Sequence, residues 1–181
     1  VDIELGGGSP STFTGTAQVS EGTVDWKVFP ESMENLQGDV RFRGRIFEFE
    51  DVTASMGELT ARASGPLDLD GGYDFSGQVN PFTVAQASDL FGATLPVAAS
   101  GSFGADVTMT GPLNKPTITT ALIAQDTVTI DQVAFREMRV DTTLTAPNVF
   151  IDSFQAMPQD GGEIAGSGQF TAVDVDLQPG V

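Results

Sequence analysis

Carboxylates are the most plentiful reactive groups in this chain, and the usual partners for catalysis are missing. The sequence contains 25 Asp and Glu residues, 8 Lys and Arg residues, no His and no Cys. Histidine is the commonest general base, and Cys is a frequent nucleophile and zinc ligand. A hydrolytic carboxylate pair would have to come from Glu48, Glu50, Asp51 and Asp152, but nothing in their spacing distinguishes them from the other acids. We therefore expect that this protein is not an enzyme.

Two acidic turns have residue types that could suggest calcium. One has Asp68, Asp70 and Asp74 around a Gly-Gly pair, and the other spans residues 160–163. Calcium requires about 6–8 oxygen ligands in a defined spacing, which neither turn provides. No phosphate-binding loop or dinucleotide fingerprint occurs either. We expect no metal and no cofactor, and we interpret both segments as solvated turns.

Three arginines, Arg41, Arg43 and Arg45, would lie on one face of a strand because they alternate. They could form a local phosphate-binding patch on an acidic body. We favour the alternative that they pair across the hairpin with Glu48 and Glu50.

The composition is that of a strongly acidic chain of ordinary hydrophobicity. Its 181 residues suffice for one domain with a core, and 40% of them are hydrophobic. A net charge of −17 argues against binding to nucleic acid or to an anionic membrane surface. No stretch approaches the about 18–20 apolar residues of a membrane-spanning helix. Because the chain begins at Val1 without a signal peptide, we expect residues 1–181 to be a single β-repeat segment excised from a larger protein.

The elements that would position these residues are short strands. Residues 36–43 and 46–50 alternate apolar and polar side chains on either side of a Gly-Arg turn, which predicts a hairpin. The alternation shifts by one residue at Asp51, which predicts a β-bulge. A second hairpin is expected around residues 70–72. Residues 83–91 have helical spacing and predict one short helix that ends at Gly92.

Two repeats run through the strands. Ser-Gly-Pro-Leu at residues 64–67 returns as Thr-Gly-Pro-Leu at residues 110–113. Residues 36–65 also match residues 138–168 loosely, with the hairpin, a Gly-Glu-aliphatic turn and a Ser-Gly pair in the same order. Repeated β units build long structures that serve more often as surfaces or conduits than as reaction sites. We expect an all-β fold, an elongated curled sheet that forms a trough of about 12–16 short strands with one short helix.

Phenylalanine dominates the aromatic residues, with 13 Phe against one Trp and one Tyr. Because Phe has no polar group, a face built from it is purely apolar. The alternation predicts that the trough holds an apolar groove lined by eight residues: Val40, Phe42, Phe47, Phe49, Phe75, Val79, Met109 and Ile118. The same residues would also suit the interior of a closed sandwich, as in a secreted adhesin-like domain.

The ordered phrases of the chain resemble the TamB-type proteins, the AsmA-like translocation and assembly modules. The most specific phrase is Thr-Gly-Pro-Leu-Asn-Lys-Pro at residues 110–116. The other matching phrases lie at residues 36–42, 54–59, 63–74, 95–103 and 162–168. The family often has Gly where Thr119 and Thr120 stand here. The resemblance implies a periplasmic β body of an envelope-spanning protein, held in the inner membrane through a segment outside this chain and partnered with an outer-membrane assembly-factor barrel protein.

Two functions are compatible with this reading. In the first, the chain is a non-enzymatic segment for outer-membrane biogenesis, whose groove carries phospholipid acyl chains between membranes. Burial of each CH₂ would contribute about 0.8 kcal/mol. In the second, open strand edges act as a chaperone or scaffold that pairs with outer-membrane β-barrel proteins by β-augmentation, to assist their insertion or translocation.

Overall fold

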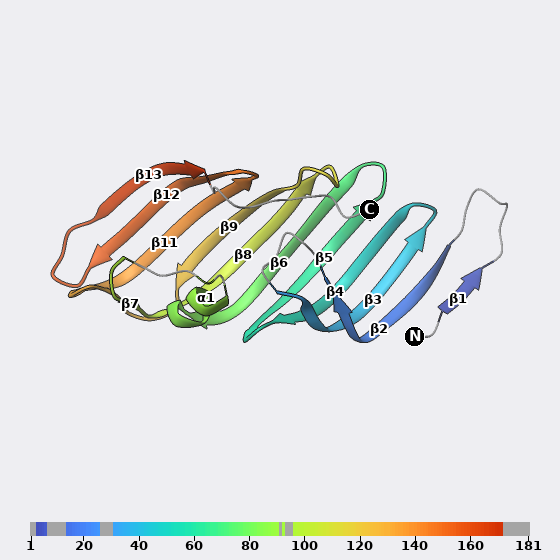
Figure 1. Ribbon diagram of the computed structural model, residues 1–181, viewed down its shortest axis with the longest axis horizontal. Coiled ribbons are helices and arrows are strands. Elements are labelled where there is room, and N and C mark those ends of the chain that lie inside the picture. The colour runs from blue at the N-terminus through green and yellow to red at the C-terminus, as the bar shows by residue number, and fades with distance from the viewer. Residues whose placement is uncertain (1–2, 7–13, 26–30, 91, 93–95, 172–181) are drawn as a thin grey trace.

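The structure is a computed structural model that describes residues 3–6, 14–25, 31–90, 92 and 96–171. Thirteen strands of this part form one antiparallel sheet, accompanied by one short helix (Figure 1). The prediction of an all-β curled sheet with one short helix is confirmed, and the strand number falls within the expected range.

Most of the strands pair with the strand next to them in the chain, as in a series of hairpins. Their bounds are β1 (Ile3–Gly6), β2 (Thr14–Val24), β3 (Met33–Arg43), β4 (Ile46–Met56), β5 (Leu59–Asp68), β6 (Gly72–Thr83), β7 (Ala99–Ser100), β8 (Ser102–Gly111), β9 (Thr117–Ala124), β10 (Val128–Ile130), β11 (Val133–Thr145), β12 (Asn148–Pro158) and β13 (Ile164–Thr171). The helix α1 (Val84–Leu90) lies between β6 and β7.

The sheet is open at both ends. Its order is β1-β2-β3-β4-β5-β6-β8-β9-β11, after which β12 and β13 continue the sheet and the short strands β10 and β7 branch from β11. Among the described residues, β1 pairs with β2 alone and β13 with β12 alone. Figure 1 shows β1 and β13 at opposite ends of one curved layer, so the sheet does not close on itself.

The repeat predicted between residues 36–65 and 138–168 has a structural counterpart. The pairing of β4 with β5 shifts register between Phe49 and Val52, beside the positive φ of 47° at Asp51. This is the predicted bulge. The pairing of β12 with β13 shifts at the equivalent place, between Ile151 and Phe154. We therefore name β3–β5 the first unit and β11–β13 the second unit.

The helix forms where its spacing predicts it, over Val84–Leu90. Thr83 caps its first turn, because the Thr83 hydroxyl accepts a hydrogen bond from the Gln86 N–H while the Gln86 side chain accepts one from the Thr83 N–H. The predicted last residue, Phe91, lies outside the described residues. Leu90 is buried, which fixes the helix against the ends of the strands (Figure 1).

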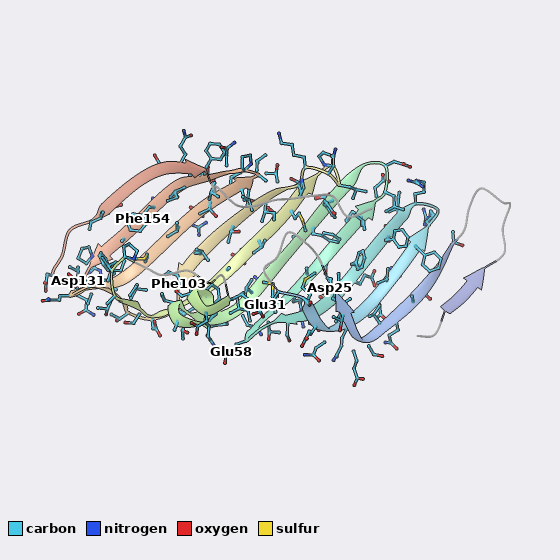
Figure 2. The ribbon with its side chains drawn as sticks, in the orientation of Figure 1. Asp25, Glu31, Glu58, Phe103, Asp131 and Phe154 are labelled. Carbon is cyan, nitrogen blue, oxygen red and sulfur yellow. The ribbon has the colours of Figure 1, made fainter. Side chains whose placement is uncertain are left out.

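The best-buried core lies in the second half of the sheet, where β10 folds beside β11. Val128, Phe135, Met138 and Ala156 form this cluster, which we name the closed corner. Val128 and Ala156 are each 1% exposed. The short strands β7 and β10 pair with each other, and the Asp131 N–H donates to the carbonyl of Ala98, so these segments cover the closed corner at the end of the sheet where Asp131 lies (Figure 2).

Candidate functional site

The eight predicted groove residues lie on one face of the sheet. In an antiparallel pair, directly opposite residues have side chains on the same face. Some of the eight residues are directly opposite each other in the sheet, and others are connected through β5 residues of the same face. The pairs are Val40–Phe49, Phe42–Phe47, Phe47–Leu67, Phe49–Gly65, Ala61–Val79, Phe75–Met109 and Met109–Ile118. We name this side the apolar face.

Aromatic rings gather on the apolar face of the first unit and β6. The rings of Phe42 and Phe47 have centroids 6.2 Å apart. Phe49 meets Phe75 edge to face at 5.4 Å, and Tyr73 lies 6.1 Å from Phe75. These five residues form what we call the Phe cluster. Edge-to-face pairs add about 0.5–1.5 kcal/mol beyond the area that they bury.

Gly65 makes the central contact of the Phe cluster possible. Phe49 lies on β4 and Phe75 on β6, with β5 between them, so their backbones are two strand spacings apart, about 10 Å. Gly65 occupies the intervening position opposite Phe49, where it has no side chain to separate the rings. A Cβ atom there would also lie 2.2 Å from the carbonyl oxygen of Asp74. The Gly of the Ser-Gly-Pro-Leu phrase is thus required by the close approach of β6.

The residues of the Phe cluster are partly exposed. Val40 and Met109 are buried, at 8% and 9% exposure, but the other six predicted groove residues are half-buried. Within the described part of the chain, the extensive contacts of β3, β4 and β5 are all with hydrogen-bonded neighbours in the same sheet. All the described strands belong to one sheet, so no separate second sheet of described strands lies over these rings.

Charged groups of these strands lie on the opposite, polar face. Arg41 forms an ion pair of 2.7 Å with Glu50, as the sequence predicts. Arg45 pairs instead with Asp70, at 2.8 Å, because the turn after β5 comes next to the turn after β3. Both pairs are solvent-exposed and each contributes about 0–1 kcal/mol. A shallow depression of about 350 Å³ on this face is lined by the middle of β5, β6 and β8.

The acidic residues do not assemble a reactive or metal-binding centre in the described part of the chain. No group of three metal-ligating side chains occurs among the described residues. In the turn after β5, Asp68 accepts a hydrogen bond from the Asp70 N–H, and Asp70 binds Arg45. The two segments proposed as solvated turns, residues 70–72 and 160–163, are both connections between strands.

Three described groups have displaced pKa values: Tyr73, and the ion-paired Arg139 and Asp141, of which Arg139 has its pKa raised by the hydrogen bond to Asp141. On the polar face, hydrogen bonds from Arg139 and Ser153 lower the pKa of Asp141. On the apolar face, burial raises the pKa of the Tyr73 hydroxyl, which is consistent with the apolar surroundings of the Phe cluster.

Tyr73 was not among the eight predicted groove residues, and the closed corner was not predicted from the sequence. Tyr73 alternates with Phe75, so the alternation itself could have placed it on the apolar face. The closed corner depends on β7 and β10, which have two and three residues. Strands of that length are too short to leave a periodic signal.

No helix among the described residues has both the length and the apolar character that crossing a membrane requires.

The comparisons identify no relative. The chain matches no protein-family model, no curated protein and no solved structure.

Proposed function

We propose that this chain is a non-enzymatic segment of a TamB-type envelope protein, and that its apolar face is the floor of a groove that binds phospholipid acyl chains. The observation that carries the proposal is the Phe cluster on an open, single layer of strands. Contiguous apolar patches that stay partly exposed on soluble proteins often mark binding sites.

The chemistry of the apolar face suits a hydrocarbon ligand. Its predicted lining residues are all Val, Phe, Met or Ile, and no described polar side chain is buried. Each CH₂ that leaves water contributes about 0.8 kcal/mol, without any requirement for a fixed orientation. An acyl chain could therefore occupy many equivalent positions along the strands, and low specificity would favour movement.

The remaining parts of the proposal follow from the sequence resemblance. The whole protein would span the periplasm, with its inner-membrane anchor outside this chain and an outer-membrane assembly-factor barrel protein as partner. The net charge of −17 disfavours lying flat on an anionic membrane, so lipid would reach the face along the groove.

Photo-crosslinking in the full-length protein tests the proposal. A photoreactive residue replaces Phe49, which lies on the apolar face, and in a matched variant it replaces the adjacent Glu48, which is exposed on the polar face. We expect phospholipid adducts, identified by mass spectrometry, at residue 49 and not at residue 48. Equal lipid adducts at both residues, or none at either, would contradict lipid binding at this face.

The same experiment distinguishes the second function. Protein adducts at residue 49 in place of lipid would favour a chaperone or scaffold. In that case, proline substitutions on strand edges should impair function more than a charge at Phe42 or Phe49 does.

A further inference from the structure

The two long sides of the sheet differ in charge. The long strands alternate in direction, so the connections between them fall at two sides, which we name the upper rim and the lower rim as they lie in Figure 1. The upper rim consists of residues 44–45, 69–71, 112–116 and 146–147. The lower rim consists of residues 25–32, 57–58, 84–98, 125–127, 131–132 and 159–163, of which 26–30, 91 and 93–95 lie outside the described residues.

The described part of the lower rim is strongly acidic. It holds eight acidic residues and no basic residue: Asp25, Glu31, Glu58, Asp89, Asp126, Asp131, Asp160 and Glu163. The one basic residue that the sequence has in these connections, Lys27, lies outside the described residues. All eight acids are exposed, and none takes part in the three ion pairs of the described residues. Figure 2 shows Glu58 and Asp131 on this side of the sheet. Because like charges add along one rim, an anion near it is repelled.

Several acidic connections of the lower rim meet. An oxygen of Glu31 lies 3.1 Å from the position that a Cβ on Gly57 would take, and Glu58 accepts a hydrogen bond of 2.9 Å from Gln86 of α1. Two connections and the helix thus come together at one part of the rim, and each carries an exposed carboxylate.

The upper rim has the opposite balance of charge. It has two basic residues, Arg45 and Lys115, and one acidic residue, Asp70. Asp70 pairs with Arg45, whereas Lys115 is exposed and takes part in no ion pair of the described residues. The strand ends beside these turns, Arg43 and Asp68, add one charge of each sign. An anion on the apolar face is therefore attracted to the upper rim relative to the lower one.

The apolar face reaches the upper rim at the Phe cluster. Phe42 and Phe47 flank the turn that holds Arg45, and Tyr73 follows the turn that holds Asp70. A tyrosine suits such a boundary, because its ring is apolar and its hydroxyl is polar. Strands β3 and β4 have 11 residues each and extend about 36 Å, whereas one leaflet contributes about 15 Å to the hydrocarbon core of a bilayer. Acyl chains that start at the upper rim thus end on the apolar face, before the lower rim.

We propose that the upper rim receives the anionic headgroup of the bound lipid, and that the acyl chains extend from it across the Phe cluster toward the lower rim. The inference rests on the proposed lipid binding and adds an orientation to it. The ammonium of Lys115 and the guanidinium of Arg45 attract a phosphate or carboxylate, while the eight carboxylates of the lower rim repel it. The trough would therefore hold anionic lipids in one direction only.

Nuclear magnetic resonance with two spin-labelled stearates tests the orientation, with the stearate carboxylate standing in for the headgroup. One probe has its label near the carboxylate and the other near the methyl end. We expect the first label to broaden the amide signals of Phe47 and Tyr73 most strongly. The second should broaden those of Ala54 and Ala61, which pair with each other in the lower half of the apolar face. Equal broadening at both ends by both probes would overturn the orientation but leave lipid binding intact. No broadening by either probe would contradict lipid binding itself, and the orientation with it.

A charge-matched pair of variants tests the cause of the orientation. Arg45→Glu with Lys115→Glu makes the upper rim acidic, whereas Arg62→Glu with Arg136→Glu changes the net charge equally at exposed positions inside β5 and β11. At low salt, the upper-rim variant should bind spin-labelled stearate about threefold or more weakly than its control, while the two bind the uncharged methyl ester equally. The methyl ester also reports whether the apolar face is still folded. Equal weakening of stearate binding in both variants, or an equal loss of stearate and ester, would count against a headgroup site at the upper rim.

Discussion

The first unit, β3–β5, and the second unit, β11–β13, have the same strand order and the same bulge but different coverage of their apolar faces. The bulges fall after Phe49 in one unit and after Ile151 in the other. In the second unit, Met138 and Ala156 belong to the closed corner. Their equivalents in the first unit, Leu36 and Ala54, are half-buried. The same backbone can therefore either complete a core or leave its apolar face open.

The side chains on the apolar face also differ between the two units. Phe42, Phe47 and Phe49 of the first unit correspond to Leu144, Val149 and Ile151 of the second, since Phe42 pairs with Phe47 as Leu144 pairs with Val149. Aliphatic residues thus suffice to build this hairpin. The aromatic residues of the first unit are not needed for the strand pairing itself, which favours a binding role for them.

The largest expected contrast is between a closed-corner residue and a Phe-cluster residue. Phe135→Ala should lower the free energy of unfolding by about 3–5 kcal/mol, because Phe135 is 6% exposed and its removal leaves a cavity. Phe42→Ala should cost only about 1–2 kcal/mol, since Phe42 is already partly exposed to water. Urea unfolding of the chain measures both values. Equal losses would mean that the Phe cluster is covered like a core.

The next contrast uses the equivalent glycines. Gly65→Ala should destabilise the chain by about 2–3 kcal/mol, because the new methyl group would collide with the Asp74 carbonyl at a backbone φ of 142°. Gly168→Ala should change stability by less than about 0.5 kcal/mol, because no atom of the described residues lies within 4 Å of the added methyl group. Thermal unfolding in dilute protein provides the comparison. A large loss for Gly168→Ala would show that another segment packs against β13.

Sequence periodicity predicted the parts of the fold that depend on local pattern. The alternation in residues 36–50 places Phe42, Phe47 and Phe49 on one face, and the phase shift at Asp51 marks the bulge. Both follow from the two-residue period of a strand, which any single strand reveals. The helix over Val84–Leu90 was also predictable from a local pattern, because its helical spacing and its Thr-x-x-Gln cap lie within one short segment.

The closed corner and the Gly65 contact could not be predicted in this way. Val128 and Phe135 become buried because β10 turns away from β9 and pairs with the start of β11, a choice that depends on distant strands. The Phe49–Phe75 contact requires two strands that are separated by a third. A pattern within one segment carries no information on such contacts, whose partners are set by the sheet order.

A smaller effect should distinguish lipid binding by the first unit from lipid binding by the second unit. Phe49→Ser should weaken binding of a spin-labelled stearate about tenfold, because the probe loses an aromatic contact worth about 1.5 kcal/mol. The equivalent substitution Ile151→Ser should weaken it about twofold or less. Electron spin resonance titration measures both affinities. If the two substitutions weaken binding equally, the first unit has no special role, and the proposed advantage of its aromatic residues is wrong.

The smallest expected contrast lies on the polar face, between Asp141 and its equivalent Asp39. Asp141 accepts hydrogen bonds from Nη2 and Nε of Arg139, at 2.7 and 3.1 Å, and from the Ser153 hydroxyl at 2.6 Å, and these bonds lower its pKa. A carboxyl with a lowered pKa stabilises the fold above its unfolded value of about 3.9, and this contribution is lost as the pH falls through the folded value. Solvent screening at this exposed site limits the contribution to about 0.5 kcal/mol.

Asp141→Asn should therefore lower the free energy of unfolding at pH 7 but not near pH 2, when measured in urea at both pH values. Asp39→Asn should have a smaller effect at pH 7, because Gln37 stands where the second unit has Arg139. Equal effects of the two substitutions at pH 7 would show that the ion pair, the feature that distinguishes the second unit here, adds nothing to its stability.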